Sequence, residues 1–171
     1  MKKVCALFLF MFFVTIIHAQ SIKGTWELVA VENQLPDGSK TQPYGVDPKG
    51  LLIFDDNGNY ALQMLRSIPS RPKFAAADKN KGTTEENAAL VQGSNSHFGK
   101  YTVDDKAHTI TFNIEHAFYP NWEGTTQVRS FNIKNDQLTY VVTNTTNGGA
   151  VTAVVIWKRY ASGANENKNL K

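Results

Sequence analysis

The sequence predicts an all-β protein, an eight-stranded antiparallel up-and-down barrel with one short helix in the loop after the third strand. Apolar residues recur mostly with a period of two, which is typical of strands that have one buried face. Turn sequences rich in Asn, Asp and Gly separate these segments. Residues 67–96 differ, because they form a stretch too long for a hairpin loop and contain a helix start signal.

The alternating pattern defines the eight predicted strands, which are residues 23–32, 50–55, 59–66, 97–103, 109–116, 125–134, 137–144 and 151–160. The turns DDNGN, DDKAH, KNDQ and TNGGA supply residues that tolerate the positive φ angles of tight hairpins. Most neighbours along the chain are therefore expected to pair in antiparallel fashion. Pairing of the last strand with the first would close the barrel.

The one predicted helix follows from a capping box. Thr83-Thr84-Glu85-Glu86 precedes residues 87–92, and Gly93 gives a stop signal. We expect this helix to lie over one end of the barrel. It could serve there as a fixed plug or as a mobile lid, and the sequence leaves both open.

Residues 1–19 are predicted to be a cleaved signal peptide. Two lysines precede an apolar run of 14 residues, 4–17, whereas a membrane-spanning helix needs about 20. Cleavage after Ala19 would make the mature chain begin at Gln20. It would also remove the single cysteine, Cys5, and leave neither a thiol nor a disulfide.

The remaining chain suits one domain, residues 20–160, followed by a short tail. Its 152 residues carry 16 basic and 15 acidic side chains, which are interspersed along the sequence. This balance argues against nucleic acid or an anionic membrane surface as a partner. Residues 161–171 contain a single large apolar residue and are predicted to be disordered.

Several motifs resemble those of the bacterial and fungal lipocalin-like domain family. Gly24-Thr25-Trp26 looks like the Gly-x-Trp of lipocalins, and further matching segments are LQMLRSIPSRPKFAA, KGTTEENAALVQGS, HFGKYTVDD, FYPNWEGTTQVRSF and VIWKR. The resemblance covers nearly all of the mature chain and implies a closed calycin-like barrel with a small-molecule cavity. The sequence lacks the disulfide and the large C-terminal helix of ordinary lipocalins, so their receptor-binding modes are not carried over.

One end of the barrel is predicted to be closed by Trp26 and Arg159. Trp157 and Arg159 share a face of the last strand, which should pair with the first. The guanidinium can then lie against the indole of Trp26, a cation–π contact of about 0.5 to 2 kcal/mol. This role is structural, and it is favoured over ligand binding.

Arg129 is the residue that most suggests a ligand. It shares a strand face with Phe131 and Ile133, which are expected to point into the barrel. A buried guanidinium is costly unless it is paired, and an anionic ligand group such as a carboxylate would supply the partner. The alternative is that Arg129 lies at the rim and reaches water or a backbone carbonyl.

His116 ends an apolar stripe that includes Phe112, whereas Glu115 points to the opposite face of the strand. The two cannot act on one substrate as an acid/base pair. A single histidine here is more typical of a partly buried, hydrogen-bonded residue than of a ligand or base. The aromatic turn that follows, FYPNW, would form either the mouth of a cavity or a packed cap.

The predicted ligand-binding set combines the polar and aromatic residues of these strands and of the turn. Its members are Gln63, Arg66, Tyr101, Phe112, His116, Phe118, Trp122 and Arg129.

The sequence contains little that would indicate a metal-binding site or a catalytic nucleophile. His108 and His116 would lie about 26 Å apart on one strand, too far to chelate one ion. Asp55-Asp56-Asn57-Gly58-Asn59 lacks the later glutamate of a calcium loop and is interpreted as a hairpin turn. The chain has no Gly-x-Ser-x-Gly elbow and no glycine-rich phosphate loop. We therefore expect neither a metal nor a cofactor.

Three functions remain. The leading one is an exported protein, periplasmic or secreted, that binds a small hydrophobic or amphipathic molecule with an acidic group. The second is an isomerase or cyclase, which needs a shaped cavity and one or two proton donors, with Tyr101, His116 and Arg129 as the candidates. The third is a plugged barrel whose exterior binds a protein. The volume of the cavity separates these possibilities.

Overall fold

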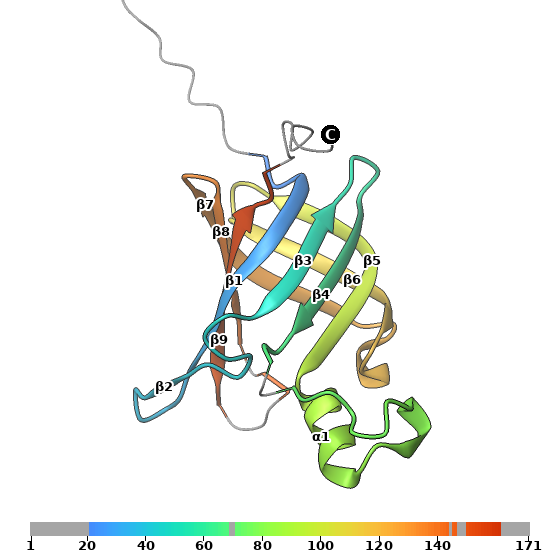
Figure 1. Cartoon of the computed structure of the whole chain (residues 1–171). Helices are drawn as coiled ribbons and strands as arrows, with labels where there is room; N and C mark the ends of the chain where they lie inside the picture. Colours follow the sequence, from blue (N-terminus) through green and yellow to red (C-terminus); the bar gives the residue numbers. More distant parts are fainter. Residues whose placement is uncertain (1–20, 69–70, 144, 147–149, 162–171) are drawn as a thin grey trace, which may run out of the picture.

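The computed structural model describes residues 21–68, 71–143, 145–146 and 150–161, which form a closed antiparallel β-barrel (Figure 1). The barrel strands are β1 (Gly24–Gln34), β3 (Lys49–Phe54), β4 (Asn59–Leu65), β5 (Ser94–Asp104), β6 (Thr109–Ala117), β7 (Thr126–Lys134), β8 (Gln137–Val142) and β9 (Thr152–Arg159). The predicted signal peptide and, from residue 162 on, the predicted tail lie outside the described residues.

The eight barrel strands follow one another in sequence order around the barrel, and β9 pairs with β1 to close it. The closing register runs from Trp26 opposite Arg159 to Gln34 opposite Thr152. A two-residue strand, β2 (Lys40–Thr41), adds to the end of β1. The predicted all-β architecture and the closure by the first and last strands are thus confirmed.

The helix α1 (Thr84–Gln92) is capped as the sequence indicates. The Thr83 hydroxyl accepts a hydrogen bond from the Glu86 amide at 3.2 Å, and the Glu86 carboxylate accepts one from the Thr83 amide at 2.9 Å. The helix was predicted after the third strand, and α1 follows β4. The difference arises because the two-residue β2 was not predicted and adds one strand to the count. Figure 1 shows α1 below the end of the barrel where β4 ends and β5 begins.

Alternation along the strands fills the barrel with apolar and aromatic side chains. On β6, for example, Ile110, Phe112 and Ile114 are buried while Asn113 is exposed. The largest fully buried side chains are Trp26, Trp157, Phe54 and Phe112. Trp26, Trp157 and Phe54 lie toward the end of the barrel that carries the first residues of β1 and the last of β9. We call this the packed end of the barrel.

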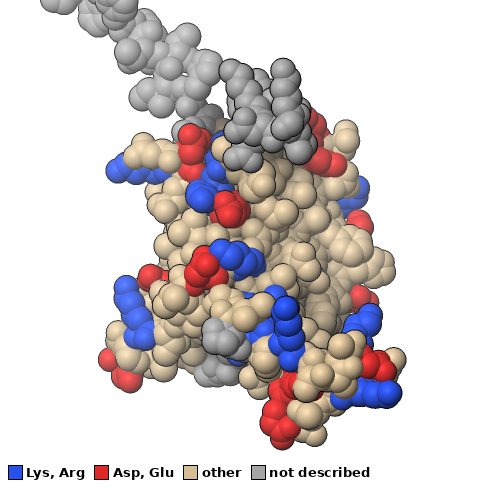
Figure 2. Space-filling view, viewed as in Figure 1, with Lys and Arg blue, Asp and Glu red and all other residues tan. Residues whose placement is uncertain are grey.

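The outer surface carries charges of both signs. Figure 2 shows basic and acidic side chains interspersed over the face in view, without a large patch of either sign. Among the described residues, none of the helices has the length and hydropathy of a membrane-spanning segment.

Candidate functional site

The packed end of the barrel is held by Arg159. Its guanidinium carbon lies 4.2 Å from the centre of the Trp26 indole, which is fully buried. The same guanidinium donates to the Asp136 carboxylate at 3.0 Å and to the backbone carbonyls of Lys23 and Ser21 at 3.0 and 2.9 Å. The Trp26 indole N–H donates to the Ile22 carbonyl at 2.7 Å. The Trp26 indole N–H and all three guanidinium nitrogens of Arg159 therefore have hydrogen-bond partners.

The opposite end holds a cavity of about 550 Å³. It lies inside the barrel mouth that is formed by the last residues of β1, β4 and β6 and the first of β5, β7 and β9. Its walls mix aromatic, aliphatic and uncharged polar side chains, which include Val31, Tyr44, Met64, Asn95, His97, Trp122, Gln127, Tyr140, Val142 and Val155. The volume suits a small organic molecule.

Arg129 supplies the only formal charge among the described lining residues. Its guanidinium carbon lies 5.9 Å from the ring centre of Phe112 and 5.8 Å from that of Tyr140, two rings that pack against each other with centres 6.2 Å apart. One of its nitrogens donates to the side-chain oxygen of Gln127. Burial lowers the pKa of Arg129 from its ordinary value, although the neighbouring tyrosines counteract this effect.

No carboxylate balances this charge. The described residues that line the cavity include no Asp or Glu, and Arg129 makes none of the ion pairs found among the described residues. A guanidinium removed from water without a counter-ion is unfavourable. An anionic or strongly hydrogen-bond-accepting group in the cavity would compensate for this cost.

Three further titratable side chains surround Arg129, and all three are held neutral. Burial, with the charge of Arg129 as a second cause, lowers the pKa of His97 to about 3. Burial raises the pKa of Tyr140 to about 12 and raises the pKa of Tyr60 still further. The hydroxyl of Tyr60 and Nδ1 of His97 are hydrogen-bonded at 2.8 Å. These groups therefore offer hydrogen bonds rather than charge.

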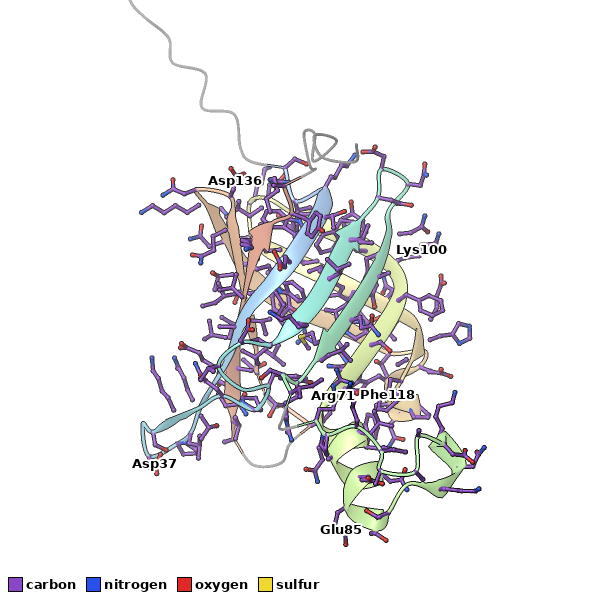
Figure 3. All side chains as sticks on the ribbon, in the orientation of Figure 1. Asp37, Arg71, Glu85, Lys100, Phe118 and Asp136 are labelled. Carbon is purple, nitrogen blue, oxygen red and sulfur yellow. The ribbon has the colours of Figure 1, made fainter. Side chains whose placement is uncertain are left out.

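The mouth of the cavity is aromatic. The short 3₁₀ helix η2 (Pro120–Trp122) places Trp122 edge-on against His97, with ring centres 5.8 Å apart, and Tyr119 packs against Trp122 at 5.5 Å. Phe118 is exposed and lines the cavity, and Figure 3 shows it on the side of the barrel nearest α1. Gly124, with φ of +71°, turns the chain back into β7.

The structure brings some of the predicted ligand-binding residues together. Arg129, Phe118 and Trp122 line the cavity. Phe112 is fully buried in the core, with its ring against the guanidinium of Arg129. The inward orientation that was predicted for Arg129 therefore agrees with the alternation of β7, on which Gln127 also faces the cavity.

Gln63 and Arg66, two other residues of the predicted ligand-binding set, do not line the cavity. Gln63 is exposed on the outer face of β4, because Leu62 and Met64 on either side of it point inward. Arg66 points toward the mouth but acts as a brace, donating to the carbonyls of Pro43 at 2.8 Å and Gln92 at 3.4 Å. The second bond ties the end of α1 to the barrel.

Tyr101 belongs to the packed end of the barrel. It is buried, its hydroxyl donates to the Asp55 carbonyl at 2.9 Å, and its ring lies 4.6 Å from that of Phe54. It borders a separate hollow near Lys23 and Phe131. Tyr101 therefore does not line the cavity that contains Arg129.

His116 faces outward, contrary to the sequence-based expectation. The β5–β6 register shifts between Phe98 and Gly99, so that Gly99 pairs with Ile114 and Phe98 with His116. Glu115 is the extra residue of this bulge, and the alternation reverses after it. His116 then lies on the outer surface, 3.5 Å from the Glu123 carboxylate. Of the three candidate proton donors, Tyr101, His116 and Arg129, only Arg129 lines this cavity.

Sequence reasoning missed the most informative polar neighbours of Arg129, namely His97 and Tyr140. Strand alternation indicates that both residues face inward. His97 lies four residues before Tyr101 on one strand, and Tyr140 lies two residues after the buried Leu138, so each pair shares a face. Within the described residues, no cluster of three or more His, Cys, Asp or Glu could hold a metal ion.

A closed up-and-down barrel with a cavity at one mouth is the architecture of lipocalin-type binding proteins. Residues 23–160 match the lipocalin-like domain family, so the chain belongs to that family. A relative described as the 4'-hydroxy-3'-methoxypropiophenone carrier protein of Aspergillus oryzae is 34% identical over 84 residues. The matched segment covers 46% of this chain and 74% of the relative.

Proposed function

We propose that the protein is a carrier for a small hydrophobic molecule that bears an anionic or readily ionised oxygen, and that Arg129 binds this oxygen. The observation that carries the proposal is a guanidinium inside a cavity of about 550 Å³ whose described lining contains no acidic residue. The aromatic and aliphatic side chains of the cavity wall, such as Tyr140, Trp122 and Val155, suit the apolar part of such a ligand. A cavity of this size also favours a carrier over a plugged barrel.

The relative narrows the class of ligand. The Aspergillus oryzae protein is named as a carrier of a hydroxyaryl ketone, which combines an aromatic ring, a phenolic hydroxyl and a carbonyl. The cavity offers matching features, namely aromatic walls, the guanidinium of Arg129 and the neutral hydrogen-bonding groups of His97 and Tyr140. We therefore propose acylphenols as the first ligands to test.

Isothermal titration calorimetry of the purified protein with 4'-hydroxy-3'-methoxypropiophenone tests the proposal. Saturable binding is expected, and Arg129→Met should weaken it by about 2 to 5 kcal/mol, because the partner of the ligand oxygen is lost. Arg159→Met is the matched control, since it removes the other barrel arginine at the packed end and should leave affinity unchanged. Absence of saturable binding, or equal affinity of the wild type and Arg129→Met, would overturn the proposal.

Export to the periplasm or the exterior is proposed as well, on the basis of the first 20 residues alone. The basic start and the apolar run of 14 residues are typical of a cleaved signal peptide. N-terminal sequencing of protein from the exported fraction should give Gln20 as the first residue. Recovery of exported protein that retains residues 1–19 would contradict this.

A further inference from the structure

We propose that the cavity takes up an acylphenol as its phenolate and releases the phenolic proton to solvent. This inference rests on the carrier function proposed above and adds the ionisation state in which the ligand is held. The O–H bond of the phenol breaks, the electron pair stays on the oxygen beside Arg129, and the proton leaves through the open mouth. The protein itself changes neither charge nor covalent structure.

The arrangement around Arg129 selects for an anion. A neutral phenol in the cavity would leave the guanidinium desolvated and without a counter-ion, whereas a phenolate compensates its charge directly. The benefit of the ion pair is greatest where water is displaced, as it would be beside Tyr140 inside the barrel. Binding energy is therefore expected to shift the ionisation equilibrium of the ligand toward its anion.

No group of the protein in the described cavity can keep the proton. His97 is the one potential base near Arg129, and its pKa of about 3 prevents it from accepting a proton at neutral pH. Tyr60 and Tyr140 already carry theirs, because burial raises both of their pKa values. The Tyr60–His97 hydrogen bond occupies Nδ1 of the imidazole. Proton release to bulk solvent is the remaining route.

A phenolate fits this site better than a carboxylate does. One nitrogen of the Arg129 guanidinium is already engaged by Gln127, which weakens the site for the bidentate fork that carboxylates prefer. A para carbonyl spreads the negative charge of the phenolate over the ring, so that its removal from water costs less than that of a compact carboxylate. The carbonyl also lowers the pKa of the phenol below the value of about 10 that tyrosine has.

The pH dependence of binding should then come from the ligand. The titratable groups that face Arg129 are Tyr60 on β4, His97 on β5 and Tyr140 on β8, and burial shifts each pKa away from neutrality. Tyr44 borders the same cavity, and burial raises its pKa too. Tyr119 at the mouth and the exposed His116–Glu123 pair lie outside the guanidinium's immediate surroundings. Affinity should rise with pH until the free phenol is ionised and then level off.

Absorbance spectroscopy with 4'-hydroxyacetophenone gives a direct test, since its phenolate absorbs at longer wavelength than the phenol. At a pH about one unit below the pKa of the free phenol, wild-type protein should raise the phenolate band of the bound probe, which corresponds to an apparent pKa lowered by about one unit or more. Arg129→Met should abolish this shift, Arg129→Lys should keep part of it, and Arg159→Met should keep all of it. The ether 4'-methoxyacetophenone, which cannot ionise, should bind about tenfold more weakly or worse.

The outcomes separate this inference from the proposed function. Saturable binding of 4'-hydroxyacetophenone without a phenolate band would overturn the inference while leaving the carrier function standing. A phenolate band that persists in Arg129→Met would also overturn it, because another group would then be the counter-ion. Absence of binding for every aromatic probe would contradict the carrier function itself. Circular dichroism of each variant establishes that it is folded.

Discussion

The two ends of the barrel each contain an arginine against aromatic rings, and the two residues have opposite surroundings. Arg159 lies 4.2 Å from the Trp26 ring and donates to one carboxylate and two backbone carbonyls. The guanidinium of Arg129 lies against the adjacent rings of Phe112 and Tyr140, and its one side-chain hydrogen bond among the described residues is to the neutral side chain of Gln127. The first arginine is satisfied by the fold, whereas the second needs a partner that the described chain does not provide.

This difference shows how to tell a structural arginine from a binding one. Cation–π contact alone does not distinguish them, because both residues make it. What distinguishes them is whether the remaining donors reach acceptors and whether a carboxylate lies nearby. Figure 3 places Asp136, the carboxylate partner of Arg159, at one end of the barrel and Phe118, a residue of the cavity mouth, near the other.

The largest effect is expected from removing the aromatic centre of the packed end. Trp26→Ala should lower the free energy of unfolding by about 3 to 5 kcal/mol, because the indole is fully buried and leaves a large void. Trp122→Ala, at the half-buried mouth, is the matched control and should cost less than half as much. Urea denaturation measures both. A loss below about 1 kcal/mol for Trp26→Ala would mean that this end is not the packed core.

A second prediction concerns acid sensitivity at the cavity end. The pKa of His97 is lowered to about 3 in the folded protein, compared with about 6.5 when unfolded. The unfolded chain thus binds more protons between these values, and stability falls as the pH is lowered through them. Between pH 7 and pH 4.5 the loss of stability that is linked to protonation of His97 amounts to about 2 kcal/mol.

His97→Gln serves as the control for this pH dependence, since the carboxylates titrate alike in both proteins. Its stability should fall less than that of the wild type over the same pH range, as measured by urea denaturation at each pH. Parallel curves for the two proteins would show that His97 is not buried as a neutral imidazole.

A smaller effect is expected from the arginine of the packed end. Arg159→Met should lower the free energy of unfolding by about 1 to 2 kcal/mol, because an exposed ion pair is worth little and the cation–π contact and carbonyl bonds account for most of the loss. Thermal unfolding measures the change. A variant as stable as the wild type would show that Arg159 does not brace the barrel end.

The smallest effect is expected on the outer surface. His116→Ala and Gln63→Ala should each change stability by no more than about 0.5 kcal/mol and leave ligand affinity unaltered, since both side chains are exposed and face away from the cavity. Calorimetric titration with the same acylphenol would reveal an error in this placement. A clear loss of affinity in either variant would mean that the ligand site extends beyond the interior.

The sequence allowed prediction of the architecture because strand alternation and turn chemistry are local signals. Trp26, Arg159 and Arg129 were assigned to faces correctly on that basis. Local alternation failed for His116, because the bulge at Glu115 reverses the faces and depends on the close approach of Gly99 to β6. A side chain built at Gly99 would collide with the Asn113 carbonyl oxygen, a contact between strands that the sequence does not reveal.

The candidate site was harder to predict than the fold. Strand alternation tells which residues face the barrel interior, but not toward which end of the barrel they lie. Tyr101 points inward as expected but lies near the packed end, bonded to Asp55. Its place along the barrel axis depends on the tilt and register of the paired strands. The same long-range geometry brings His97, from the start of β5, beside Arg129, from β7. The spacing of His97 and Arg129 along the sequence does not indicate that they are neighbours.

The contrast between the two arginines is tested most directly by the ligand-free stability of Arg129→Met. Urea denaturation of the purified apo protein should give a free energy of unfolding equal to or higher than that of the wild type, because the substitution removes an uncompensated charge from the barrel interior. A loss of more than about 2 kcal/mol would instead show that Arg129 is a structural brace like Arg159, and that the cavity is not organised around an unpaired charge.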